Sequence, residues 1–230
     1  MKTELKLAVF DVDGLMLDSE AFYANAWADA FNLNSKKEHR VNKKVLIKWF
    51  YNNLSGKKIG NQLDFIQSYY KNNDIKLIYE EYRKLFAKRI NTDKVKVRKG
   101  FFYLIKFLKR NNIKLAIATT ANLNTLSNLL KNSGIDISMF SVVVSSDLGL
   151  PYKPSPEPYL AACKLSNVDV SNAIAFEDSE SGVMSACNAK LKCFLIPGRA
   201  TINNNVKQAS FCVCNNLKQC VRVIKNNFCF

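Results

Sequence analysis

The stretch FDVDGLMLDSE, residues 10–20, continues a short apolar run, LAV at residues 7–9. Two aspartates, Asp11 and Asp13, stand two residues apart where that run ends, and Gly14 follows them. In an open α/β sheet, ligands bind outside the carboxyl ends of the strands, and side chains two apart in an extended segment point to the same side. The stretch therefore predicts a buried strand that delivers carboxylates to a pocket.

The pair of aspartates also predicts a cation. Two carboxylates so close together repel each other unless a positive charge lies beside them. Mg²⁺ takes oxygen ligands. We therefore expect Mg²⁺ to be the cofactor.

Short apolar runs rich in Val, Ile and Phe recur along the chain and alternate with helical patterns. The expected strands are residues 5–10, 113–119, 140–146, 173–177, 192–196 and 211–214. The expected helices between them are residues 100–111, 124–133, 155–164 and 179–188. Buried parallel strands have this composition, and the alternation predicts an α/β fold with a doubly wound, Rossmann-like parallel sheet.

The alternation stops in one long segment near the N-terminus. There the ranges 21–31, 43–53, 60–72 and 77–90 all have the pattern of amphipathic helices. We therefore expect a helical cap domain at residues 18–96, inserted after the first strand. The α/β core domain would then consist of residues 1–17 together with 97–230.

Three further segments complete a set of motifs with residues 10–20. They are LAIATTAN at 115–122, KPSPEP at 153–158 and AIAFEDSESG at 173–182. In this order the four segments resemble the motifs of the haloacid dehalogenase-like hydrolase superfamily. The patterns DxDGLxxDSE, KPxPEPYLxA and EDSxxG are most similar to its β-phosphoglucomutase-like branch, which also contains many phosphatases of small metabolites. The resemblance covers nearly the whole chain and implies a cap that closes over the carboxyl ends of the strands.

The resemblance implies roles for the acidic residues. Asp11 would be the nucleophile that forms an aspartyl-phosphate, and Asp13 the general acid and then the base for the attacking water. Asp11, the backbone carbonyl of Asp13, and Asp178 would hold the metal. Glu177 would be a further ligand or a neighbour of the ligands, and the sequence leaves open which carboxylate binds the metal directly.

The phosphate group of a substrate needs donors and positive charge. The resemblance implies that the Thr119 hydroxyl binds a phosphate oxygen, helped by backbone N–H groups around Thr120 and Ala121. Lys153 would balance the negative charge that develops on the transferred group, and it would keep Asp11 ionised.

Substrate selection is expected to depend on the cap. The segment LSGKK at 54–58 resembles the family's specificity loop, so Lys57 and Lys58 are candidate substrate-binding residues, together with Gly14 of the first motif. An ordinary solvated pair of lysines is an equally open interpretation of Lys57 and Lys58.

We predict a Mg²⁺-dependent phosphatase that hydrolyses a small phosphomonoester, a sugar phosphate or a nucleoside monophosphate. A phosphomutase of the β-phosphoglucomutase type is the alternative. Such mutases carry a histidine soon after the DS pair and an arginine in the cap loop, where this chain has Phe22-Tyr23 and Lys57-Lys58-Ile59. A second alternative is a non-enzymatic basic binding protein on the same fold.

The composition of the chain limits the classes of partner that we expect. The formal net charge is +15, but the lysines are spread along the chain without regular aromatic interleaving, so nucleic-acid binding is disfavoured. No apolar run approaches the ~20 residues of a membrane span, and the seven cysteines form no CxxC pair for zinc. We expect a cytoplasmic monomer or weak dimer, without a membrane partner, that acts on a small phosphorylated metabolite.

Overall fold

The structure is a computed structural model that describes residues 2–35, 37, 40–53, 64, 66–68 and 74–230. The chain forms two compact units, one made of Met1–Asp18 with Val95–Phe230 and the other of Ser19–Lys94. Both boundaries lie within two residues of those expected from the sequence.

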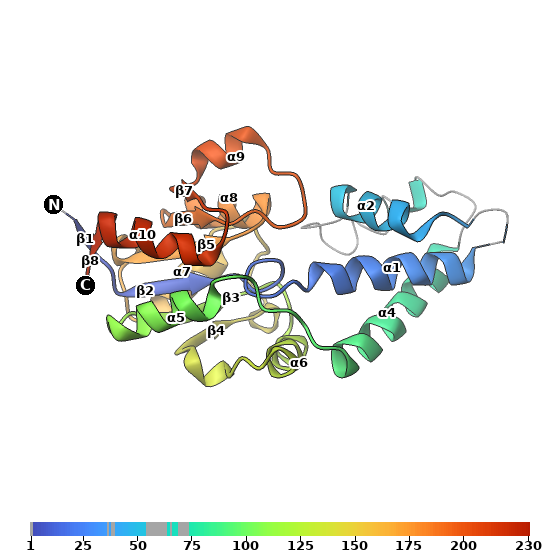
Figure 1. Ribbon diagram of the computed structural model, residues 1–230, viewed down its shortest axis with the longest axis horizontal. Helices are drawn as coiled ribbons and strands as arrows, with labels where there is room; N and C mark the ends of the chain where they lie inside the picture. The colour runs from blue at the N-terminus through green and yellow to red at the C-terminus, as the bar shows by residue number, and fades with distance from the viewer. Residues whose placement is uncertain (1, 36, 38–39, 54–63, 65, 69–73) are drawn as a thin grey trace. The chain divides into compact units, whose positions relative to one another are not determined.

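The first unit is built on a six-stranded sheet with the order β4-β3-β2-β5-β6-β7 (Figure 1). All five neighbouring pairs are parallel, which confirms the predicted fold class. The strands are β2 (Leu7–Phe10), β3 (Lys114–Ala118), β4 (Val142–Val144), β5 (Ala173–Glu177), β6 (Lys192–Leu195) and β7 (Cys212–Val213). Each lies inside a range that the sequence predicts.

Helices cover both faces of this sheet (Figure 1). They are α5 (Phe101–Arg110), α6 (Leu123–Ser133), α7 (Glu157–Leu165), α8 (Glu180–Asn188), α9 (Asn204–Ala209) and α10 (Leu217–Asn227), with short 3₁₀ turns η2 (Ile137–Met139), η3 (Ser146–Leu148) and η4 (Val170–Asn172). Leu7 and Val9 of β2 share a buried cluster with residues of α7 and α8. On the other face the Phe10 ring meets the Phe101 ring of α5 edge to face at 6.2 Å, and α10 packs beside α5.

Several elements differ from the sequence expectations. The helix expected from residue 155 begins at Glu157, with Pro158 in its first turn. The asparagine-rich segment expected as a loop is the start of α9, because Asn203 caps that helix by accepting from the Asn205 N–H. The strands β1 (Thr3–Glu4) and β8 (Phe228–Cys229), which pair in parallel, have no alternating pattern long enough to predict.

The second unit is helical over its described residues. It contains α1 (Glu20–Asn34), α2 (Lys43–Asn53) and α4 (Ile75–Thr92). Trp27 of α1 stacks on Tyr82 of α4 with ring centroids 4.2 Å apart. Asp29 of α1 forms ion pairs with Lys43 at 2.6 Å and with Arg89 at 2.5 Å. One aromatic stack and one shared carboxylate therefore join the three helices.

Most of the helix expected at residues 60–72 lies outside the described residues, and the described ones, 64 and 66–68, are helical. Among the helices that the structure describes, none is both long enough and apolar enough to span a membrane.

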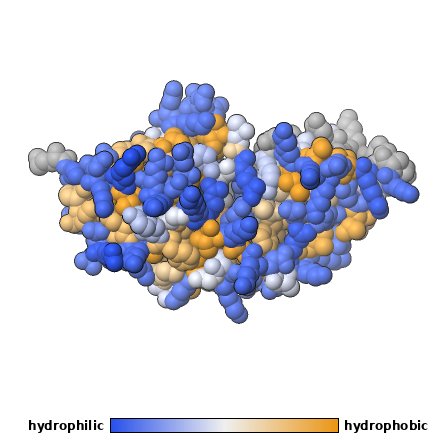
Figure 2. All heavy atoms as spheres, viewed as in Figure 1, coloured by the Kyte–Doolittle hydropathy of each residue, from blue (hydrophilic) through white to orange (hydrophobic). Residues whose placement is uncertain are grey.

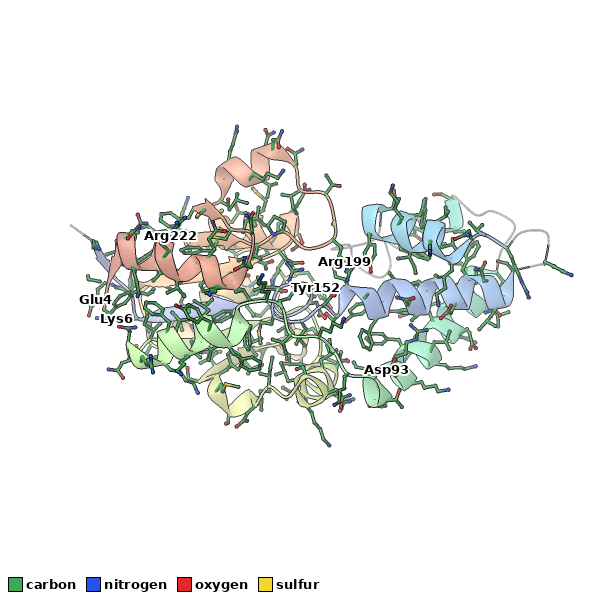
Figure 3. All side chains as sticks on the ribbon, in the orientation of Figure 1. Glu4, Lys6, Asp93, Tyr152, Arg199 and Arg222 are labelled. Carbon is green, nitrogen blue, oxygen red and sulfur yellow. The ribbon has the colours of Figure 1, made fainter. Side chains whose placement is uncertain are left out.

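The chain leaves the first unit after Asp18 and returns to it at Val95. Just inside that unit, Leu17 and Val97 form an antiparallel bridge, and the Asp18 N–H donates to the Lys96 carbonyl at 2.8 Å. Arg199, labelled in Figure 3, donates through Nε and Nη2 to the two carboxylate oxygens of Asp18 at 2.9 and 2.6 Å. The outgoing and returning segments are thus fastened to each other and to the loop after β6.

Candidate active site

The carboxyl ends of three adjacent strands bring the expected site residues together. Phe10 of β2 lies in register with Ile117 of β3 on one side and with Phe176 of β5 on the other. Asp11 therefore follows the central strand, directly between the ends of β3 and β5. Its own N–H donates to the Phe176 carbonyl at 3.1 Å, which fixes the backbone from which its carboxylate projects.

Lys153 joins all three of these strand ends. Its Nζ donates to Asp11 Oδ1 at 2.6 Å and to Glu177 Oε1 at 2.6 Å, and also to the Ala118 carbonyl at 3.0 Å. The side chains are nearly inaccessible, with 4% of Lys153, 11% of Asp11 and 0% of Glu177 exposed. A lysine ammonium has three donors. All three are used, which fixes the position of the charge.

The Glu177 carboxylate accepts from four groups. Oε1 receives the Lys153 ammonium and the Tyr159 hydroxyl, the latter at 2.6 Å. Oε2 receives the Asp178 N–H at 3.1 Å and the Ser179 hydroxyl at 3.3 Å. A carboxylate offers about four lone-pair sites. The chain's own donors therefore saturate Glu177, which suits it to anchor Lys153.

Gly182 makes room for this carboxylate. A Cβ atom added at Gly182 would overlap the side chain of Glu177. The first turn of α8 can therefore pass over the end of β5 only with glycine at this position, and the Ser179 hydroxyl, which caps α8, accepts from the Gly182 N–H at 3.1 Å.

Burial dominates the electrostatics of Asp11. Desolvation raises the pKa of its carboxyl to about 8, against the opposing effect of Lys153, and the nearby charges of Glu177 and Asp13 raise it further. Burial alone would lower the pKa of Lys153, but Asp11 and Glu177 outweigh it and raise that pKa above its usual value. The site thus holds more negative charge than one lysine neutralises, and Lys153 alone does not keep Asp11 ionised, as the resemblance had implied, because burial outweighs its effect.

The acidic residues fit a small hard cation. Asp11, Glu177 and Asp178 are all buried, and one carboxylate oxygen from each lies within 4.8 Å of the others. The donor set is all oxygen, which is the chemistry that Mg²⁺ requires. Because Glu177 is saturated, Asp11 and Asp178 are the two carboxylates best suited to direct coordination.

Asp13 and Gly14 lie in a tight turn directly after Asp11. The Met16 and Leu17 N–H groups both donate to the Val12 carbonyl, at 3.0 and 3.1 Å, and Gly14 N–H donates to the Leu17 carbonyl at 2.8 Å. Gly14 is buried and Asp13 is half-buried. The charge of Asp13 acts on the Asp11 carboxyl, so the pair predicted from the sequence shares one environment.

The end of β3 carries the expected phosphate-binding residues. Thr119 is buried, Ala121 is half-buried and Thr120 is exposed. The Ala121 N–H donates to Thr119 Oγ1 at 3.1 Å, which orients the threonine hydroxyl and leaves its proton for another acceptor. The Ala121 N–H, which the resemblance implied as a donor to the phosphate, is therefore already used inside the turn.

Two contributors were not predicted from the sequence. The Tyr159 hydroxyl and the Gly182 contact both depend on how α7 and α8 pack against β5, which a local pattern does not reveal. The only sequence signal was their place in the quoted patterns KPxPEPYLxA and EDSxxG. Lys57 and Lys58 lie outside the described residues.

Residues 8–196 match the family profile of the haloacid dehalogenase-like hydrolases, and the chain belongs to that family. The predicted family and enzyme class, a hydrolase, are therefore confirmed.

Individual relatives agree with this assignment. The chain is 31% identical over 203 residues to YhcW of Bacillus subtilis, named as a candidate phosphatase, with 86% of each chain covered. It is 26% identical over 196 residues to the phosphorylated carbohydrates phosphatase of Thermotoga maritima, covering 82% of this chain and 83% of the relative. The crystal structure of CbbY from Rhodobacter sphaeroides in complex with phosphate superposes with a TM-score of 0.75 at 22% identity, covering 94% and 96% of the two chains. The last similarity concerns the fold.

Proposed function

We propose that this hydrolase is a Mg²⁺-dependent phosphatase of small phosphomonoesters, with phosphorylated sugars as its main substrates. The observation that carries the proposal is the buried network in which Lys153 bridges Asp11 and Glu177 at the carboxyl edge of the sheet. The name of the Thermotoga maritima relative, a phosphatase of phosphorylated carbohydrates, favours sugar phosphates over nucleoside monophosphates.

The first step is an in-line attack. A carboxylate oxygen of Asp11 forms a bond to phosphorus while the bond from phosphorus to the ester oxygen breaks. Asp13 donates a proton to that leaving oxygen, so a neutral alcohol departs and an aspartyl-phosphate remains on Asp11. Lys153 and the Thr119 hydroxyl stabilise the negative charge on the transferred group.

The second step returns the enzyme to its starting state. Asp13, now a carboxylate, removes a proton from water, and the water oxygen attacks phosphorus while the bond to Asp11 breaks. The products are inorganic phosphate and free Asp11. Mg²⁺ bound by Asp11, Asp178 and the Asp13 carbonyl would neutralise charge on the phosphoryl oxygens during both steps.

The two-step scheme makes Asp11 indispensable. Asp11→Asn keeps the shape and removes the nucleophile, so phosphate release from a panel of sugar phosphates and nucleoside monophosphates should fall at least about 10³-fold. The control is Glu157→Gln, because Glu157 is exposed on α7 and makes no contact with the network; it should turn over normally. Turnover that survives in Asp11→Asn would remove Asp11 from the nucleophile role. Conversion of glucose 1-phosphates to glucose 6-phosphates, without phosphate release, would favour the mutase.

A further inference from the structure

The positive charge of the first unit is concentrated on one pair of helices. That unit contains 19 basic and 11 acidic residues, a net charge of +8. α5 and α10 together contain six basic and no acidic residues. On the opposite face of the sheet, α7 and α8 contain one basic and two acidic residues. Basic residues from two segments more than 100 residues apart in the sequence therefore share one face of the fold.

The six cations point into solvent. They are Lys106, Lys109, Arg110, Lys218, Arg222 and Lys225, all exposed (Arg222 is labelled in Figure 3). None of them forms an ion pair with an acidic residue in the part of the chain that the structure describes. We call this surface the basic helix face. In Figure 2 the basic helix face is mainly hydrophilic, with some hydrophobic side chains among the hydrophilic ones.

The two helices run side by side and begin together. Leu217 N–H, at the start of α10, donates to the Lys99 carbonyl, just before α5, at 3.2 Å. A Cβ on Gly100 would collide with the backbone of Lys218, and Gly100 has a φ of +91°, so glycine permits this close start. The cations of α10 recur at spacings of four and three residues, which places them in one row along the exposed side.

Aromatic rings lie among these charges. Lys218 Nζ lies 5.3 Å from the centroid of the Tyr103 ring, and Lys225 Nζ lies 5.6 Å from that of Phe107. Phe102 and Tyr103 are 51% and 52% exposed, and Phe230 is 48% exposed. Rows of cations with accessible rings are the combination that single-stranded nucleic acids bind, through phosphates and stacked bases.

We propose that the basic helix face binds single-stranded RNA. The row of cations can pair with the phosphates of a single strand, and the exposed rings can stack on its unpaired bases. An anionic bilayer fits less well. The exposed positions of α10 carry only lysine, arginine and asparagine, and those of α5 are apolar only at the adjacent Phe102 and Tyr103, so no apolar strip runs along the helices. This binding is independent of the proposed phosphatase activity, since none of its residues belongs to the catalytic network.

The experiment measures the binding of a fluorescein-labelled oligouridine of about 20 nucleotides by anisotropy, across a series of salt concentrations. Lys218→Gln/Arg222→Gln/Lys225→Gln should lower the affinity at least tenfold at low salt. Loss of three phosphate contacts should also reduce the slope of log affinity against log salt by about 2. Phosphate release by this variant should equal that of the unmodified chain, which shows that the fold is intact.

The matched control removes the same charge elsewhere. Lys164→Gln/Lys190→Gln/Lys207→Gln changes exposed lysines on α7, directly after α8 and on α9. Its affinity should stay within about twofold, because its phosphate contacts are retained. An equal loss of affinity in both triple variants would overturn the proposal, because it would show that binding depends only on the net charge of the protein. Absence of RNA binding at low salt, or binding of phosphatidylserine vesicles that RNA does not displace, would also overturn it.

A second variant tests stacking. Phe102→Ala should lower the affinity about tenfold and leave the salt slope unchanged, because base stacking involves no counterion. Unchanged affinity in this variant would overturn the assignment to single strands.

Discussion

At the residue scale, Tyr159 determines how the active-site lysine is held. Its hydroxyl shares Glu177 Oε1 with Lys153, and the whole side chain is buried. Burial raises the pKa of the Tyr159 hydroxyl well above its usual value, and the charge of Glu177 raises it further, so the tyrosine remains a donor at every working pH. A neutral, permanent donor fixes the Glu177 carboxylate without adding charge, and the fixed carboxylate in turn holds the Lys153 ammonium in place beside Asp11.

Tyr159→Phe tests this positioning role. The variant removes one hydrogen bond to a charged acceptor, so the free energy of unfolding should fall by about 1.5–3 kcal/mol in a urea titration. The turnover number should fall about tenfold or more, with a smaller change in KM, because Lys153 is held less firmly. Tyr103→Phe is the control, because Tyr103 is half-exposed on α5 and remote from the network. A turnover number unchanged in Tyr159→Phe would leave the hydroxyl with a stabilising role alone.

The carboxylates that cluster at the strand ends could be predicted at this scale, but the residues that position them could not. Asp11, Glu177 and Asp178 stand directly after or at the end of apolar strands, and Lys153 stands beside a helix start, so local pattern located them. Tyr159 and Gly182 act across the packing of a helix on a strand. Their roles depend on distances between segments that one sequence does not contain.

At the element scale, the helical unit depends on a line of stacked rings. Trp27 of α1 stacks on Tyr82 of α4, and Tyr82 lies 5.8 Å from Phe86 on the same helix. Tyr23 of α1 stacks on Phe86 at 4.6 Å. Two rings from each helix therefore form one continuous row, with the two α4 rings between the two α1 rings, and this contact holds the antiparallel pair together.

Trp27→Ala should loosen this unit. Trp27 is 3% exposed, and truncation of a buried tryptophan leaves a cavity that costs about 3–5 kcal/mol. We expect lower helical signal in circular dichroism and an earlier urea midpoint. Leu33→Ala provides the comparison on the same helix, because Leu33 is 61% exposed and its loss should change stability by less than about 0.5 kcal/mol. Equal effects of the two variants would contradict the role of the stack.

Elements with a long apolar pattern were predicted well, and short ones were not. All six strands of the main sheet were expected because each is a continuous apolar run. α9 begins in asparagines and has little apolar pattern. α10 was not predicted, although its buried residues Leu217, Cys220, Val221 and Ile224 have the i, i+3, i+4, i+7 spacing of an amphipathic helix. The pairing of β1 with β8 joins the two ends of the chain, which no local window can detect.

At the scale of the whole molecule, the active-site charge should couple stability to pH. In the metal-free protein the pKa of Asp11 is raised from 3.8 to about 8 by burial first. Between these values the folded chain keeps a proton that the unfolded chain has released, so the stability falls as the pH rises through this window. A cation that binds the ionised Asp11 carboxylate offsets this loss of stability. The stabilisation that the cation provides should therefore increase toward pH 8.

The measurement is the melting temperature with Mg²⁺ and with a chelator, from about pH 5.5 to about pH 8.5. The increase produced by Mg²⁺ should be small at the acid end and largest at the alkaline end. Asp11→Asn, which cannot ionise, should show an increase that does not vary with pH. The same pH dependence in that variant would assign the titration to another group.

The position of β2 has a consequence for the order of folding. β2 is a central strand, but both of its partners are synthesised much later: Leu7 pairs with Lys114 and with Ala173. At a translation rate of roughly 5–20 residues per second, several seconds pass between the synthesis of β2 and that of its first partner strand, β3. The whole helical unit, residues 19–94, is synthesised within that interval. On the ribosome the inserted helices can therefore be in place before the sheet that carries the chemistry has begun to assemble.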